Sequence, residues 1–145
     1  MDDRGTQGIV KKAAEWNKPN FVIGETRFRI EKLLPMRAFD VMEMIRVAIG
    51  GSIEGDSDNM MAFIVRVVLS IPREKLKEIR DSLFEQVYFR NKQVKTETAV
   101  FGMEEMAFNG LEPSSVYRVL VSAVLVNFRE SFPAELFKVS GIDQD

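Results

Sequence analysis

The side chains that could do chemistry in this sequence are mainly carboxylates, because the chain contains no histidine and no cysteine. An acidic loop carries Glu54, Asp56 and Asp58, and a carboxylate pair follows later at Glu104 and Glu105. Carboxylate oxygens are ligands for hard cations, but this loop lacks the spacing of an EF-hand and its terminal bidentate glutamate. We therefore interpret these residues as solvated carboxylates and expect neither a metal nor a cofactor.

Two other stretches have the residue types of catalytic or phosphate-binding motifs. Ser114 and Ser115 could supply a nucleophile, but no histidine or other evident base accompanies them. Residues 50–52, Gly-Gly-Ser, could form a phosphate cradle, but they follow a helical pattern and no Lys-Ser/Thr comes after them. A helix stop explains the glycines better. With the commonest general base also missing, we expect that the protein is not an enzyme.

The length and net charge of the chain further restrict the class of protein. The 145 residues fit one domain with a substantial core. The 20 basic and 22 acidic residues give a net charge of −2, which argues against a nucleic-acid-binding surface. The apolar runs fall short of the roughly 20 residues that span a bilayer, and no signal peptide is visible. We expect a cytoplasmic protein that binds neither nucleic acid nor membrane.

A β-hairpin is predicted over residues 21–30, with its two-residue turn beginning at Gly24. Phe28 alternates with Arg27 and Arg29, so one face of the hairpin should be buried and the other wet. The two arginines could contact an acidic partner. We interpret them instead as solvent-facing strand residues.

Prolines and apolar periodicity predict the helices. Pro35, Pro72 and Pro113 stand where a helix can begin without needing the missing N–H. Residues 60–69 and 116–126 are apolar enough to be the most buried elements. The predicted helices cover residues 35–49, 60–70, 73–84 and 113–128, with one helical turn at 103–108, a short helix from Pro133, and a second strand pair at 86–90 and 94–101.

This order of elements predicts one domain over residues 1–145. We expect an α+β fold that is mostly α, a small helical bundle with one or two β-hairpins. Residues 1–18 and 139–145 should be loosely ordered.

Asn127 and Leu125 stand out in the C-terminal helix. Asn127 falls on the apolar face, so we expect it to be buried and hydrogen-bonded to backbone near the helix end. Leu125 falls beside Arg118 and Ser122 on the side that we interpret as wet. Apolar residues around the junction with the next helix could therefore form a binding patch, and we name Leu125, Phe128, Phe132 and Phe137, with Phe128 the first to be expected in the core.

A second candidate surface lies on the helix over residues 35–49. Met44 and Val47 fall on its polar side, where apolar residues favour a partner over a core role. Flexible methionine side chains suit surfaces that must re-pack against apolar partners, although they also fill gaps in cores.

Two stretches carry a family resemblance. The first is F-R-I-E-K-L-L-P-M-R-A-F at residues 28–39, and the second combines M-A-F-N-G-L at 106–111, V-Y-R-V-L at 116–120 and V-N-F-R-E-S-F at 126–132. In these motifs and in the order of its elements, the chain resembles the tail assembly chaperones of long-tailed bacteriophages.

The resemblance implies a non-enzymatic protein that acts in the infected cell. Such a chaperone binds the tape measure protein, keeps that long helical chain soluble and helps recruit tail-tube subunits. A homo-oligomer is compatible with this role. The alternatives are a structural virion component, such as a connector or baseplate piece retained in the particle, and a host-like adaptor domain.

Overall fold

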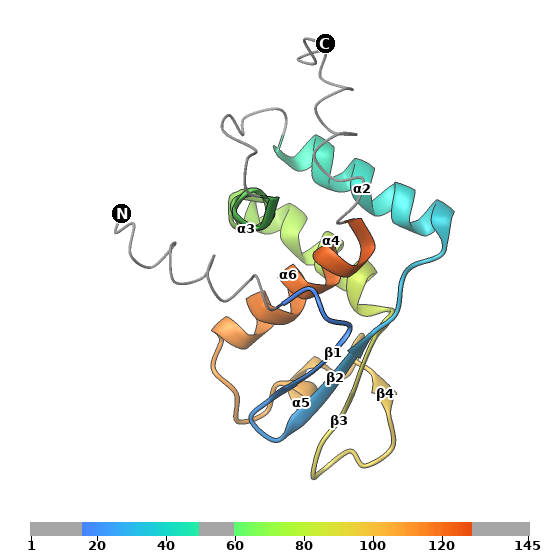
Figure 1. Ribbon diagram of the computed structural model, residues 1–145, viewed down its shortest axis with the longest axis vertical. Coiled ribbons are helices and arrows are strands. Elements are labelled where there is room, and N and C mark those ends of the chain that lie inside the picture. The colour runs from blue at the N-terminus through green and yellow to red at the C-terminus, as the bar shows by residue number, and fades with distance from the viewer. Residues whose placement is uncertain (1–15, 50–59, 129–145) are drawn as a thin grey trace.

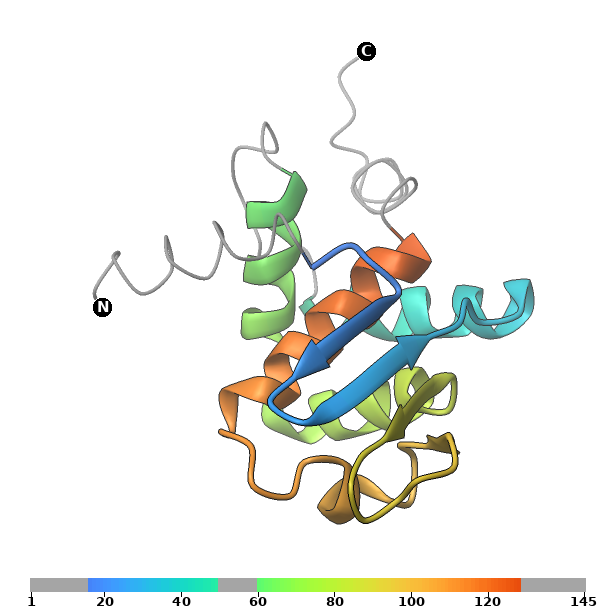
Figure 2. The same cartoon turned by 60° about the horizontal axis from the view of Figure 1, so that its bottom comes forward.

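The computed structural model describes residues 16–49 and 60–128, which form a four-stranded antiparallel sheet and a layer of helices (Figure 1). The helices gather on one side of the sheet, and α6 runs directly behind β1 and β2 (Figure 2). The elements in chain order are β1 (Asn20–Ile23), β2 (Thr26–Ile30), α2 (Pro35–Ile49), α3 (Met60–Ser70), α4 (Arg73–Phe84), β3 (Val87–Arg90), β4 (Thr98–Ala99), α5 (Glu104–Ala107) and α6 (Ser114–Phe128).

The hairpin β1–β2 has the predicted turn. Ile23 pairs with Thr26, and Gly24 adopts a φ of 59°, a conformation that glycine enters without steric cost. A Cβ at Gly24 would also lie 3.0 Å from Cδ2 of Leu111, so the turn approaches the loop before α6 closely. Phe28 is buried on the inner face of the hairpin, which confirms the predicted alternation.

The two predicted hairpins form one sheet, with strand order β1-β2-β3-β4. β2 pairs with β3 through the register Phe28 to Phe89 and Ile30 to Val87. The α+β class is therefore confirmed, but the arrangement as a helical bundle with separate hairpins is wrong. β4 is also shorter than predicted, because only Thr98 and Ala99 pair with β3.

The helices begin where the prolines predict. α2 starts at Pro35, α4 follows Pro72, and α6 follows Pro113. α5 is the expected single turn, and Gly110 follows it with a positive φ of 77°. On the exposed side of α4, Lys77 donates a hydrogen bond to Asp81 at 2.8 Å, an i,i+4 pair that supports the helix.

The core lies between the sheet and the helices α3, α4 and α6. α6 packs against α3, α4 and β2, while α2 packs against α4. The predicted burial of α3 and α6 is confirmed for most of their described side chains, although Leu69 and Tyr117 are exposed. The buried residues of these two helices include Ile64, Val65, Val67, Val68, Val119, Leu120, Val121, Ala123 and Val124.

Several expectations lie outside the described residues. These are the acidic loop with Glu54, Asp56 and Asp58, the helix from Pro133, and the loosely ordered ends. Within residues 16–49 and 60–128, no helix has both the length and the apolar character needed to cross a bilayer.

Candidate functional site

The described residues of the predicted C-terminal binding patch are buried and do not form a surface. Leu125 is only 1% exposed and Phe128 only 3% exposed, so both belong to the core. The expectation that Leu125 is exposed is wrong, whereas the core position of Phe128 was foreseen. Phe132 and Phe137 lie outside the described residues.

Arg118 and Ser122 explain the error over Leu125, since their polarity had defined the wet side of α6. Ser122 is fully buried. The guanidinium of Arg118 lies 4.8 Å from the ring centre of Trp16 and 4.5 Å from that of Phe21. These aromatic rings cover the arginine through cation–π contacts. The polar side of α6 therefore faces the start of the described chain and β1.

The predicted backbone hydrogen bonds of Asn127 are confirmed, but the residue is less buried than predicted. It is half-buried, its Oδ1 accepts a hydrogen bond from the backbone N–H of Leu33 at 2.8 Å, and its Nδ2 donates to the carbonyl of Ala123 at 2.9 Å. The side chain thus joins the end of α6 to the segment just before α2.

The second candidate surface, on α2, is open at Val47, whereas Met44 packs partly against the core. Val47 is 64% exposed and Met44 is half-buried. Leu34, Met36 and Phe39, at and before the start of the same helix, are also exposed. These three were not predicted as site residues. The helical periodicity of the sequence could have identified Met36, because this residue falls on the same side of the helix as Val47.

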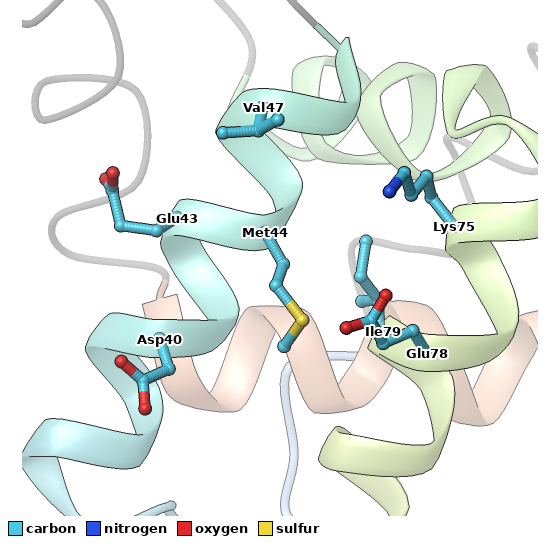
Figure 3. A pocket seen from close by; sticks show the side chains of 7 residues that line it. All are labelled: Asp40, Glu43, Met44, Val47, Lys75, Glu78 and Ile79. Atoms are coloured by element: carbon cyan, nitrogen blue, oxygen red, sulfur yellow. The ribbon is translucent and has the colours of Figure 1, made fainter.

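A groove separates α2 from α4 (Figure 3). Met44 extends from α2 between the two helices, and Ile79 and Lys75 face it from α4. The groove has a volume of about 370 Å³, and its lining combines an apolar floor with a charged rim. We call this the α2–α4 groove; its lining residues are Asp40, Glu43, Met44, Val47, Lys75, Glu78 and Ile79.

Glu43 on the rim forms an ion pair with Arg46 of the same helix. Nε and Nη2 of Arg46 donate hydrogen bonds to the two carboxylate oxygens of Glu43, at 3.1 and 2.9 Å. These hydrogen bonds hold the pKa of Glu43 below its ordinary value. Glu43 is therefore ionised and locally neutralised at neutral pH, whereas Asp40 and Glu78 leave the rim with negative charge.

The start of α2 is held against α4 by Arg37. Its Nη2 donates to Oγ of Ser82 at 3.1 Å and pairs with Glu85 at 3.2 Å. Together with the bond from Leu33 to Asn127, this contact fixes the direction in which α2 leaves the sheet. The exposed apolar residues of α2 therefore lie on a helix whose start is held in place by these hydrogen bonds.

The described carboxylates do not form a metal centre. No group of three possible metal ligands occurs within residues 16–49 and 60–128. Glu104 instead accepts a hydrogen bond from the backbone N–H of Gly102 at 3.1 Å, a local structural role at the start of α5. The arrangement on α2 offers apolar contact with a charged border, which is chemistry for binding.

Comparisons of the chain with protein-family models, with curated proteins and with solved structures each find no match.

Proposed function

We propose that the protein is a non-enzymatic assembly chaperone that binds an apolar helical segment on α2. Following the resemblance of its motifs, the partner is the tape measure protein of a long-tailed bacteriophage, bound in the cytoplasm of the infected cell before the tail tube polymerises. Recruitment of tail-tube subunits is part of this proposal. The observation that carries it is the exposure of Met36, Phe39 and Val47 along α2, with exposed Leu34 just before the helix.

The shape and chemistry of this surface support helix-in-groove binding. An amphipathic helix docks by placing apolar anchors, spaced by one turn, into a groove. Met44 and Val47 provide apolar contact inside the α2–α4 groove, and Met36 and Phe39 extend it toward the start of α2. Methionine side chains re-pack easily, which suits a chaperone that must accept successive stretches of a long partner.

The charged rim adds a preference for the partner. Asp40 and Glu78 border the groove without an ion pair to Lys75 among the described residues. A partner helix with lysine or arginine beside its apolar stripe would find complementary charge there. The exposed apolar anchors would supply most of the binding free energy, and the rim would set orientation.

Co-expression with the cognate tape measure protein tests the proposal. The wild-type chain should raise the soluble yield of the tape measure protein, and a Met36→Asp/Val47→Asp variant should not. A Leu69→Asp/Phe101→Asp variant is the matched control, because it alters two exposed apolar residues outside α2. Circular dichroism must first show that both variants are folded.

Equal rescue by the wild type and the α2 variant would remove this surface from the proposal. Mass spectrometry of purified particles then separates the two phage roles. A chaperone should be absent from mature particles, whereas stoichiometric retention would favour a structural virion component instead.

A further inference from the structure

The outer face of the sheet carries a second, chemically different surface. β1 and β2 lie in front of α6 in Figure 2, with no described element in front of them. At the end of this face near the hairpin turn, four cations line a shallow hollow of about 290 Å³, together with Glu25 and Asn91. We call these residues, Arg27, Arg90, Lys92 and Lys95, the β2–β3 basic patch.

The register of the sheet forces two of these cations together. Arg27 on β2 is the direct partner of Arg90 on β3. Like charges placed opposite each other on neighbouring strands destabilise a sheet. Both side chains are exposed, and neither they nor Lys95 form an ion pair with any residue that the structure describes.

The adjacent row of the same face shows the opposite arrangement. Arg29 lies over the ring of Tyr88 at 4.7 Å and donates to both carboxylate oxygens of Glu97, at 2.9 and 2.7 Å. It also pairs with Glu31. The fold therefore gives Arg29 two ion pairs, whereas Arg27 and Arg90, two positions along, form none within the described residues, although Glu97 still attracts Arg90 at longer range.

We propose that the β2–β3 basic patch binds a carboxylate-bearing segment of a partner protein. A guanidinium donates two parallel hydrogen bonds to a carboxylate, and two neighbouring guanidiniums without an ion pair suit a short acidic sequence. Lys92 is already paired with Glu25 at 2.9 Å, so the positive charge that forms no ion pair within the described residues lies on Arg27, Arg90 and Lys95. Binding of an acidic segment would relieve the repulsion that the register creates.

The surroundings of the patch favour an acidic polypeptide over nucleic acid. Single-stranded nucleic acid binds on open aromatic rings. Tyr88 is the aromatic residue on this part of the face, and Arg29 already covers its ring.

The proposal is independent of the groove on α2 and can be tested with a simple probe. Fluorescence anisotropy measures binding of a labelled oligo-glutamate peptide, with an oligothymidylate of equal charge in a parallel titration. The wild type should bind the peptide, more weakly as salt rises. Arg27→Gln/Arg90→Gln should weaken peptide binding by about tenfold. The matched control Lys32→Gln/Arg73→Gln, which removes two exposed cations elsewhere, should change it less than about twofold.

A further variant separates binding from folding. Arg27→Glu places an opposite charge across from Arg90, so it should raise the unfolding temperature while it abolishes peptide binding. Peptide binding by the wild type with loss in both patch variants supports the proposal. No binding by the wild type, equal loss in the control, or binding of oligothymidylate in place of the peptide would overturn it.

Discussion

Asn127 and Leu33 are joined by a hydrogen bond of 2.8 Å from the backbone N–H of Leu33 to the side-chain oxygen of Asn127. The bond connects the last turn of α6 with the residue that precedes the exposed apolar stretch of α2. Because Leu33 itself is buried, its N–H has little access to water if the amide is removed. One side chain thereby couples the core helix to the position of the proposed binding surface.

Replacing Asn127 by leucine should lower the free energy of unfolding by about 1–3 kcal/mol, because the N–H of Leu33 loses its acceptor. Urea denaturation followed by circular dichroism measures this change. Asn20→Ala, at an exposed amide on β1, is the control and should have little effect. An unchanged midpoint in Asn127→Leu would show that this bond does not contribute to stability.

The assignment of α3 and α6 to the core predicts that Val65→Asp and Val124→Asp each abolish soluble expression. Both valines are 1% exposed, and an unpaired carboxylate buried there costs several kcal/mol. Leu69→Asp and Tyr117→Asp test exposed positions on the same two helices and should be tolerated. Soluble, cooperatively unfolding proteins with either core substitution would contradict the assignment.

Ser122 should be replaceable by alanine with a gain in stability. Its hydroxyl is buried and has no hydrogen-bond partner among the described residues. An unsatisfied buried hydroxyl costs about 1–3 kcal/mol, and alanine nearly preserves the packing. Ser82→Ala should have the opposite effect, because Ser82 accepts a hydrogen bond from Arg37. Thermal denaturation should show a higher melting temperature for Ser122→Ala and a lower one for Ser82→Ala than for the wild type. A lower melting temperature for Ser122→Ala would refute the prediction for that residue.

Acid should weaken the fold partly through Glu97. Hydrogen bonds from Arg29 hold the pKa of Glu97 below its ordinary value of 4.5. The folded state then binds a proton less readily than the unfolded state. The resulting stability is present above pH 4.5 and is lost as the pH falls through the lowered pKa.

Urea midpoints measured from neutral to acidic pH should therefore decline less steeply in Glu97→Gln than in the wild type. Glu105→Gln is the comparison, since this exposed carboxylate has no ion pair within the described chain. An identical slope in wild type and Glu97→Gln would exclude a contribution from the Arg29 pair.

Local sequence chemistry was sufficient for most individual elements. Gly24 supplied the turn, and Pro35 and Pro72 marked where helices begin, because backbone preferences of glycine and proline act over a few residues. The pairing of β2 with β3 could not be found in this way. Strand patterns specify an inward face but do not identify the neighbour, which is chosen by tertiary packing.

The candidate site was only partly predictable for a related reason. Val47 was correctly placed on the outside of α2, because the described elements bury only one side of that helix. Leu125 was misplaced because α6 is surrounded by α3, α4 and the sheet, and polar neighbours do not mark solvent on such a helix. The cover that Trp16 and Phe21 provide for Arg118 depends on contacts distant in sequence, which helical periodicity does not contain.

The strand order has a consequence for the path of folding. β1 and β2 are adjacent in the chain, so their hairpin closes a short loop. β2 and β3 are separated in the chain by α2, α3 and α4, so their pairing closes a long loop. Closing that long loop costs more entropy and slows folding of the sheet. Until β3 pairs with β2, the backbone N–H and C=O groups on that edge of β2 are unpaired, and a strand of another chain can pair with them. Pulsed hydrogen exchange should find amides of the hairpin protected before those of β3, and a newly synthesised chain would be most prone to aggregate in that interval.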